Sequence, residues 1–236
     1  MDSGNIGFVL LCAAFVFVMT PGLAMFYGGL VRKKNVVNTM MTSIFIIGIG
    51  IVMWVLFGYS LSFAPSGNAF IGDFRWLGLE GVSLTEGYTD GASIPNMVFS
   101  AFQMMFAVIT PALITGAVAG RMKFKSIFVF TIFWSLIVYY PLAHMVWGQG
   151  GLLGADGIGA LDFAGGDVVH ISSGVSALVL CILLGKRHDY EHSIYRIHNI
   201  PTVVLGASLL MFGWFGFNAG SALAADGLAA HAFMTT

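Results

Sequence analysis

Long runs of hydrophobic residues, separated by short polar stretches, make up most of the chain. A helix needs about 20 mostly apolar residues to cross a bilayer, and six runs are long enough: residues 6–30, 39–63, 94–119, 125–144, 167–184 and 200–222. Backbone groups in lipid must pair within their own segment, so we expect helices rather than isolated strands. The pattern therefore predicts an all-α, polytopic membrane helix bundle.

Composition agrees with this prediction. The 236 residues are 58% hydrophobic and 9% charged, with a mean hydropathy of +0.89, whereas a soluble domain carries roughly 25% charged residues. The first five residues lack the basic segment of a signal peptide, so the first run is expected to be a retained span. The net charge of −1 gives no indication of nucleic-acid binding.

The charged residues are distributed unevenly between the loops. Nine of the ten Lys and Arg residues follow the first, third or fifth run, and the exception is Arg75. The other loops carry acidic residues: Asp73, Glu80, Glu86, Asp90, Asp156 and Asp162. By the positive-inside rule the odd-numbered loops face the cytoplasm. We therefore expect a multi-pass protein of the cell membrane with its N-terminus outside.

His170 is the most informative ionisable residue near a span. It lies eight residues after Asp162, which corresponds to about 12 Å if both residues share one helix. A polar side chain at that depth usually faces a pore or a partner. The alternative is a histidine that only bonds to a neighbouring helix. Asp162 and Asp167 are expected near the start of this helix, where they either cap it or contact a cation.

The remaining histidines and cysteines indicate structural roles. His144 is expected at the outer end of the fourth run, and His188, His192 and His198 in a solvated cytoplasmic loop. Cys12 and Cys181 lie in apolar runs and are expected to be buried. We find no metal-ligand spacing, no disulfide framework and no catalytic arrangement, so an enzyme is not expected.

Aromatic and polar residues recur at helical spacing in two runs. Phe102, Gln103 and Phe106 occupy adjacent turns of the third, and the sixth carries Trp214, Phe217, Asn218 and Ser221. Aromatic faces with a hydroxyl and an amide nearby could hold a small cation through cation–π contacts. Ordinary packing or lipid contact is the alternative for any one of them.

Five stretches together resemble the Amt branch of the Amt/Mep/Rh ammonium transporter family. They are residues 21–35, 102–106, 143–148, 162–173 and 213–221. The resemblance implies a bundle of eleven helices in two five-helix halves of inverted topology, assembled as a trimer with one pore per subunit. Residues 1–236 would then be one partial transporter domain, the first half plus the start of the second. An apolar run from Gly227 to Thr236 is too short to span, so we expect a fragment.

The same resemblance implies roles for individual residues. An outer site that recruits ammonium would consist of Phe102, Phe106, Trp147 and Ser221, supported by Asp162. Phe106 and Phe217 would form a stacked pair that closes the pore. His170 would be the first of two pore histidines, with Trp214 also lining the path, and the second histidine would belong to a later helix.

The expected function is transport of ammonium or ammonia across the membrane, without a cofactor or metal. The family also implies a homotrimer and a possible PII-type regulatory protein on the cytoplasmic face. Two alternatives remain open: an ammonium-sensing domain coupled to a signalling partner, and an Rh-type gas channel. A proton-coupled carrier of larger solutes would need broken helices and membrane-buried charge pairs, which the sequence lacks. Trp147 and the Phe102–Phe106 spacing favour the Amt branch over the Rh branch.

Overall fold

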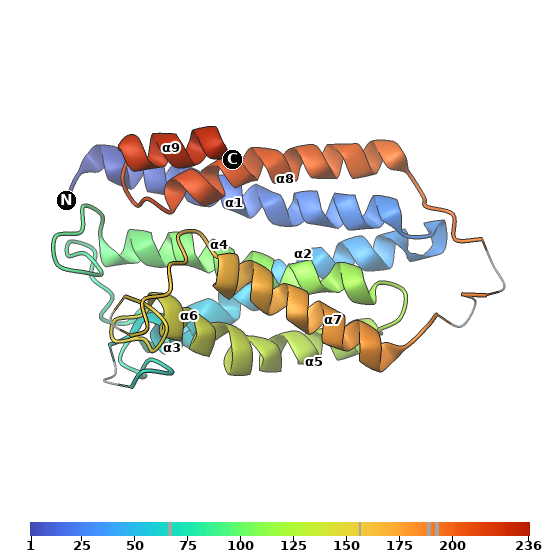
Figure 1. The fold of residues 1–236 in the computed structure, drawn as a ribbon, viewed down its shortest axis with the longest axis horizontal. Helices are drawn as coiled ribbons and strands as arrows, with labels where there is room; N and C mark the ends of the chain where they lie inside the picture. Colours follow the sequence, from blue (N-terminus) through green and yellow to red (C-terminus); the bar gives the residue numbers. More distant parts are fainter. Residues whose placement is uncertain (66–67, 156, 188–189, 192–193) are drawn as a thin grey trace.

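The chain forms a bundle of long helices in the computed structural model (Figure 1), which describes residues 1–65, 68–155, 157–187, 190–191 and 194–236. The α-helices are α1 (Ser3–Leu30), α2 (Val36–Met53), α3 (Tyr59–Phe63), α4 (Asn96–Val118), α5 (Phe124–Trp134), α6 (Tyr140–Trp147), α7 (Ser172–Leu184), α8 (Ile200–Gly220) and α9 (Gly227–Thr235). Two short 3-10 turns are Lys33–Asn35 and Leu77–Leu79. No strand occurs in these ranges, and the predicted all-α class is confirmed.

Six continuous helical segments are long and apolar enough to cross a membrane: Ser3–Leu30, Lys33–Phe63, Asn96–Val118, Phe124–Trp147, Gly166–Leu184 and Ile200–Gly220. They coincide with the six predicted runs, which confirms a polytopic helix bundle. The second segment begins at Lys33 rather than residue 39, because a 3-10 turn leads directly into α2. The fourth continues past residue 144 to Trp147. The inverted repeat stays a prediction.

Three of these segments contain a π-helical stretch that the sequence pattern did not predict: Trp54–Gly58, Ser135–Tyr139 and Gly166–Ile171. The first packs on the start of α6, directly after the second, because a Cβ added to Gly58 would lie 2.7 Å from the ring of Tyr140. Trp54 also packs on Tyr140, with ring centroids 6.1 Å apart. An extra residue in a helical turn re-aims the side chains that follow it, and here the re-aimed rings fill the space between two spans.

Glycines bring α1 and α8 into close contact, and the two helices run antiparallel along one side of the bundle (Figure 1). A Cβ added to Gly216 would lie 2.7 Å from the Cβ of Phe15 and 3.0 Å from the carbonyl oxygen of Cys12. Small residues let membrane helices approach closely where lipid offers no hydrophobic driving force between them. These glycines position α8 and the residues at its C-terminal end.

The helix that carries His170 begins part of the way along the bundle, not at its end (Figure 1). Asp162 precedes it in the connecting loop, so the prediction that Asp162 and His170 share one helix about 12 Å apart is wrong. His170 instead lies in the π-helical first turns, and its backbone N–H donates to Gly165 O at 3.0 Å. The position of His170 along the bundle is therefore set by the loop before the helix and not by a long helix that begins at Asp162.

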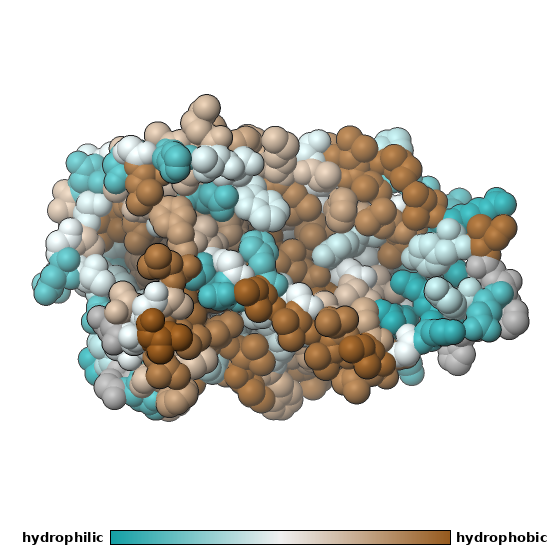
Figure 2. All heavy atoms as spheres, in the orientation of Figure 1, coloured by the Kyte–Doolittle hydropathy of each residue, from teal (hydrophilic) through white to brown (hydrophobic). Residues whose placement is uncertain are grey.

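The surface separates into an apolar middle and polar ends (Figure 2). The end opposite the N-terminus carries most of the basic residues, and there the guanidinium groups of Arg32 and Arg187 lie 4.9 and 4.8 Å from the ring centroid of Tyr195. His198 lies in the same loop and is exposed, whereas His188 and His192 lie outside the described residues. This distribution matches a bundle that crosses a membrane, with one basic end.

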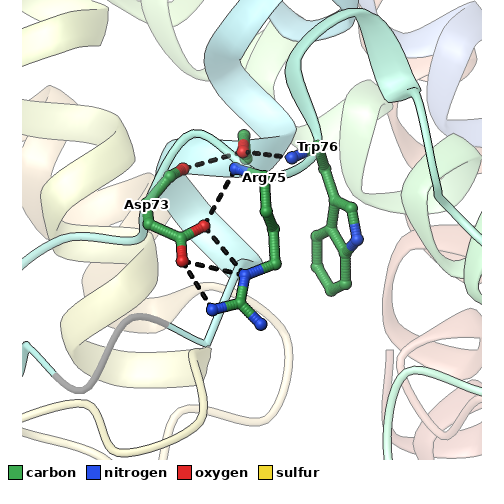
Figure 3. A network of polar contacts seen from close by, with 4 residues as sticks. Asp73, Arg75 and Trp76 are labelled. Carbon is green, nitrogen blue, oxygen red and sulfur yellow. Dashed lines mark hydrogen bonds and ion pairs between the residues drawn. The ribbon is translucent and has the colours of Figure 1, made fainter.

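A polar network fastens the loop after α3 to the other end of the bundle (Figure 3). Ser60 Oγ donates to Asp73 O at 2.7 Å and accepts from the backbone N–H of Trp76 at 3.0 Å. Arg75 pairs with the carboxylate of Asp73, with Nη2 2.6 Å from Oδ2. The Trp76 ring stacks on Tyr59 with a centroid distance of 5.4 Å. The loop is therefore held against the helices that surround the site described next.

Candidate functional site

A cavity of about 400 Å³ opens at the end of the bundle where the N-terminus lies. The loop before α4, the loop after α6 and the chain after α8 form its rim, and α4 forms its floor. Four of the predicted ammonium-recruiting residues line it: Phe106, Trp147, Asp162 and Ser221. We call this space the outer cavity. The structure thus brings together residues that lie more than a hundred positions apart in the sequence.

Two aromatic rings form a corner of the outer cavity. Phe106 and Trp147 meet edge to face, with centroids 6.1 Å apart and planes at 89°. The indole Nε1 of Trp147 donates to the carbonyl oxygen of Asp162 at 2.8 Å, which fixes the ring. Ser221 Oγ donates to Phe217 O at 2.9 Å and keeps lone pairs that can accept. Such a corner can hold a small cation against π faces and a hydroxyl.

Phe102 lies behind the cavity rather than on its surface. Its side chain is 1% exposed, and its ring packs edge to face on Phe106 with a centroid distance of 4.9 Å. A Cβ added to Gly220 would lie 2.7 Å from the Phe102 ring. Phe102 therefore fills the contact between α4 and α8 and supports the ring of Phe106.

Asp162 is a helix cap in this structure. Its Oδ1 accepts from the backbone N–H groups of Gly165 and Gly166 at 2.5 and 2.8 Å, and its Oδ2 from those of Asp167 and Val168 at 2.8 and 3.0 Å. Four bonds satisfy donors that a helix start leaves unpaired. Of the two roles expected for Asp162, capping has direct geometric support. Its remaining lone pairs still border the outer cavity.

The two rings of the predicted phenylalanine pair are in contact beside the cavity, with Phe106 in its lining. The rings of Phe106 and Phe217 lie 4.3 Å apart between centroids, with planes at 32°, and both side chains are 1% exposed. Phe106 comes from α4 and Phe217 from α8, so the pair joins two helices that are distant in sequence. At this separation no water molecule fits between the rings.

His170 and Trp214 lie on the inner side of that pair. The imidazole of His170 stacks on the indole of Trp214 at 5.4 Å and 16°, and its centroid is 5.9 Å from that of Phe217. Trp214 and Phe217 are 6.0 Å apart. The order from the outer cavity inward is therefore Phe106, Phe217, then His170 with Trp214. The rings of Phe217, His170 and Trp214 all contact one another, and this cluster adjoins Phe106 through Phe217.

His144 has the structural role expected for it. It is fully buried, and its ring nitrogens lie 3.1 Å from Ser62 O and 2.9 Å from Asn68 O. Cys12 is buried, whereas Cys181 is partly exposed, and both are free. Within the described ranges, no three His, Cys, Asp or Glu side chains are grouped so that they could hold a metal ion.

Sequence reasoning missed the part of the cavity that loops supply. Additional lining residues are Tyr88, Thr89, Ala92, Ser93, Ile94, Phe99, Gln103, Phe163, Ala222, Leu223 and Ala224. Leu223 has a φ of 58°, which is uncommon for a residue other than glycine. Gln103 was noted on the same turns as Phe106 without a role. No periodic pattern identifies the loop residues, because their place depends on how the chain folds back.

The fold and the site define a class: a polytopic α-helical membrane protein with an aromatic cavity, a phenylalanine pair beside it and a partly buried histidine in contact with that pair. The family model described as "Ammonium Transporter Family" matches residues 7–236. The chain therefore belongs to the ammonium transporter family, and the predicted resemblance is confirmed.

Three relatives illustrate the match. The chain is 53% identical to the ammonium transporter of Bacillus subtilis (strain 168), covering 100% of this chain and 57% of that protein. Among solved structures it resembles Saccharomyces cerevisiae Mep2, with a TM-score of 0.89, 37% identity, and 100% and 52% of the two chains covered. It also resembles a "Sensor Amt Protein", with a TM-score of 0.84, 30% identity and coverage of 96% and 56%. The chain spans about half the length of the curated relatives it matches.

Proposed function

We propose that the protein that contains these residues moves ammonium nitrogen across a membrane. An ammonium ion is held in the outer cavity by the faces of Phe106 and Trp147 and by Ser221. It then gives up a proton to water at the open mouth of the cavity, and neutral ammonia passes the Phe106–Phe217 pair to the path lined by His170 and Trp214. The observation that carries the proposal is the succession of ring contacts, from Phe106 in the aromatic cavity to Phe217 and from Phe217 to His170.

Desolvation is the physical reason for passing the neutral molecule. An isolated charge loses far more solvation free energy than a neutral amine when it enters an apolar passage. The two phenylalanine rings offer no hydrogen bond to replace the water that ammonium sheds. His170 offers ring nitrogens that donate or accept once the molecule is past them, and imidazole exchanges protons near neutral pH.

An ammonium sensor is the second candidate, favoured by the resemblance to the "Sensor Amt Protein". A sensor needs the same outer cavity to bind its ligand, but it need not let the molecule pass. Binding without transport would therefore separate the two functions. We prefer transport because the described contacts continue inward from the cavity to His170.

The assembly and setting are part of the same proposal. We expect a homotrimer in the cell membrane with the N-terminus outside, and a PII-type regulatory protein on the basic, cytoplasmic face. For orientation, the free cysteines Cys12 and Cys181 are first replaced by serine. A cysteine introduced at Thr85 should then react with an impermeant thiol reagent added outside intact cells, and one at Glu191 should not. The reverse pattern would contradict the orientation and with it the outer position of the cavity.

Transport is tested with the product of the complete open reading frame, reconstituted in vesicles. Methylammonium uptake, with ammonium as competitor, gives an apparent affinity for each. Phe106→Leu should weaken ammonium affinity about tenfold, because a desolvated cation–π contact is lost. Phe133→Leu is the matched control, since Phe133 is 58% exposed on α5 and should leave affinity unchanged. Equal affinities in the two variants would contradict recruitment at the outer cavity.

A further inference from the structure

Gln103 is a buried amide in the lining of the outer cavity. It lies on α4 between Phe102 and Met104, and its side chain is 8% exposed. Of the buried polar side chains in the described residues, it is the one that lines the outer cavity. Its Oε1 is buried and has no hydrogen-bond partner within the described residues. Buried carbonyl oxygens are nearly always bonded, so an unpaired one calls for an explanation.

Two other polar side chains of the cavity, Asp162 and Ser221, already take part in hydrogen bonds. The carboxylate of Asp162 accepts hydrogen bonds from four backbone N–H groups, and the hydroxyl of Ser221 donates a hydrogen bond to Phe217 O. The rings of Phe106 and Trp147 attract positive charge without providing a directional acceptor. An ammonium ion has four N–H donors that lose water when it enters. The cavity therefore needs oxygen acceptors besides Ser221 Oγ, and Gln103 carries one without a partner.

We propose that Gln103 determines specificity in the outer cavity, where its side-chain carbonyl oxygen accepts a hydrogen bond from ammonium. This inference rests on the proposed function. The terminal amide of glutamine turns about a soft torsion, so Oε1 swings to the cavity side when the ion arrives. The bond is charge-assisted, which makes it stronger than one between neutral groups.

The same contact explains how methylated ions would be distinguished. Each methyl group on nitrogen removes one N–H donor, so a methylammonium ion leaves an acceptor in the cavity unpaired in some of its orientations. A site that leaves a buried acceptor unpaired rejects the wrong ligand much more strongly than a purely apolar pocket does. Gln103 should therefore favour ammonium over methylammonium.

The test compares Gln103→Met with Gln103→Glu in vesicles that contain the complete protein. Methionine keeps the length of the side chain and removes the acceptor, whereas glutamate keeps oxygen atoms at the same place. We expect Gln103→Met to weaken ammonium affinity about tenfold or more while methylammonium affinity changes less. Gln103→Glu should keep the ammonium affinity near or above that of the wild type.

Several outcomes overturn the inference. If Gln103→Met retains both the affinity and the preference for ammonium, the amide only fills space. If maximal uptake falls and neither affinity changes, its role is structural. Where Gln103→Met is not recovered as folded protein, Gln103→Leu is measured in the same way. Absence of uptake and ammonium binding by the wild type would contradict the proposed function itself, which separates the two failures.

Discussion

Helices α4 and α8 each contribute one ring to the closed pair, yet they are held in very different ways. In the most apolar window of α4, 61% of residues are buried, against 22% in that of α8. Helix α4 contacts α1, α2, α5 and α7, whereas α8 packs chiefly on α1 and the short α9. The helix that carries Phe106 is thus held from several sides and the helix that carries Phe217 from few, although both rings are buried.

The difference shows what positions a ring in a membrane protein. Apolar side chains on the open side of α8, such as Leu205, Met211 and Phe212, are about half exposed within the described residues. Among the described residues, few side chains therefore hold this face of α8. Its position depends instead on the glycine contact with α1, which makes that contact the sensitive point of the pair.

The largest effect is expected from Gly216→Ala. The new methyl group would meet the Cβ of Phe15 and the backbone oxygen of Cys12, and backbone cannot move aside cheaply. We expect destabilisation of about 1–3 kcal/mol, together with displacement of Phe217 from Phe106. Thermal unfolding in detergent measures the first.

Gly174→Ala on α7 is the matched control, because a Cβ there has nothing within 4 Å. Alanine is intrinsically better than glycine in a helix by about 1 kcal/mol, so this variant should be equally or more stable than the wild type. Equal stability of Gly216→Ala and Gly174→Ala would show that the α1–α8 contact does not limit the position of α8.

A smaller effect is expected from Asp162→Asn, which tests the cap of the helix that carries His170. Asparagine offers one acceptor oxygen in place of two and lacks the charge that favours a helix start. We expect a loss of about 1–2 kcal/mol, measured by thermal unfolding. Asp226→Asn is the matched control and should lose less stability. Asp226 caps α9 by accepting one bond, from Ala229 N, which the asparagine oxygen can also accept. Matching losses in the two variants would contradict the four-bond cap.

The smallest effect is expected at the rim. The Arg75 guanidinium holds the pKa of Asp73 below its usual range. A lowered pKa stabilises the fold above the unfolded-state value of about 3.9, and that contribution is lost as the pH falls through the lower folded value. Arg75→Gln should therefore be slightly less stable than the wild type at pH 7, with the difference fading in acid. Lys186→Gln, at the other end of the bundle, is the control and should leave this pH dependence unchanged. If the stability difference between Arg75→Gln and the wild type stays constant with pH, the pairing of Arg75 with Asp73 is contradicted.

The spans could be predicted closely, because lipid imposes a length and an apolar composition on every helix that crosses it. The π-helical stretches could not, since they arise from packing between spans, as where Gly58 meets Tyr140. The depth of His170 was expected for the wrong reason. The separation of eight residues predicts a helical rise from Asp162 to His170, but Gly165 has a φ of 105° and lets the loop turn just before the helix begins.

Most of the site residues were predicted from the resemblance to the family and not from their spacing in the sequence. Periodicity alone placed Phe102 and Phe106 on adjacent turns and could not tell that Phe102 packs behind the cavity. No sequence pattern predicts that the loop residues Thr89 and Leu223 line the cavity, since their positions depend on how loops far apart in the sequence fold against each other. Gln103 could have been found from its place beside Phe106, but its unpaired oxygen is visible only in three dimensions.

His170→Asn in the complete protein tests the central claim most directly. Asparagine is similar in size and polarity but exchanges no proton near neutral pH. Membrane current and methylammonium uptake are measured on the same vesicles, with folding checked by thermal unfolding. If His170 lines the path behind Phe106 and Phe217, the folded variant should show altered uptake, altered charge per molecule moved, or weaker discrimination against potassium. Unchanged current and uptake in well-folded His170→Asn would mean that His170 only packs against Trp214, and the proposed path would be wrong.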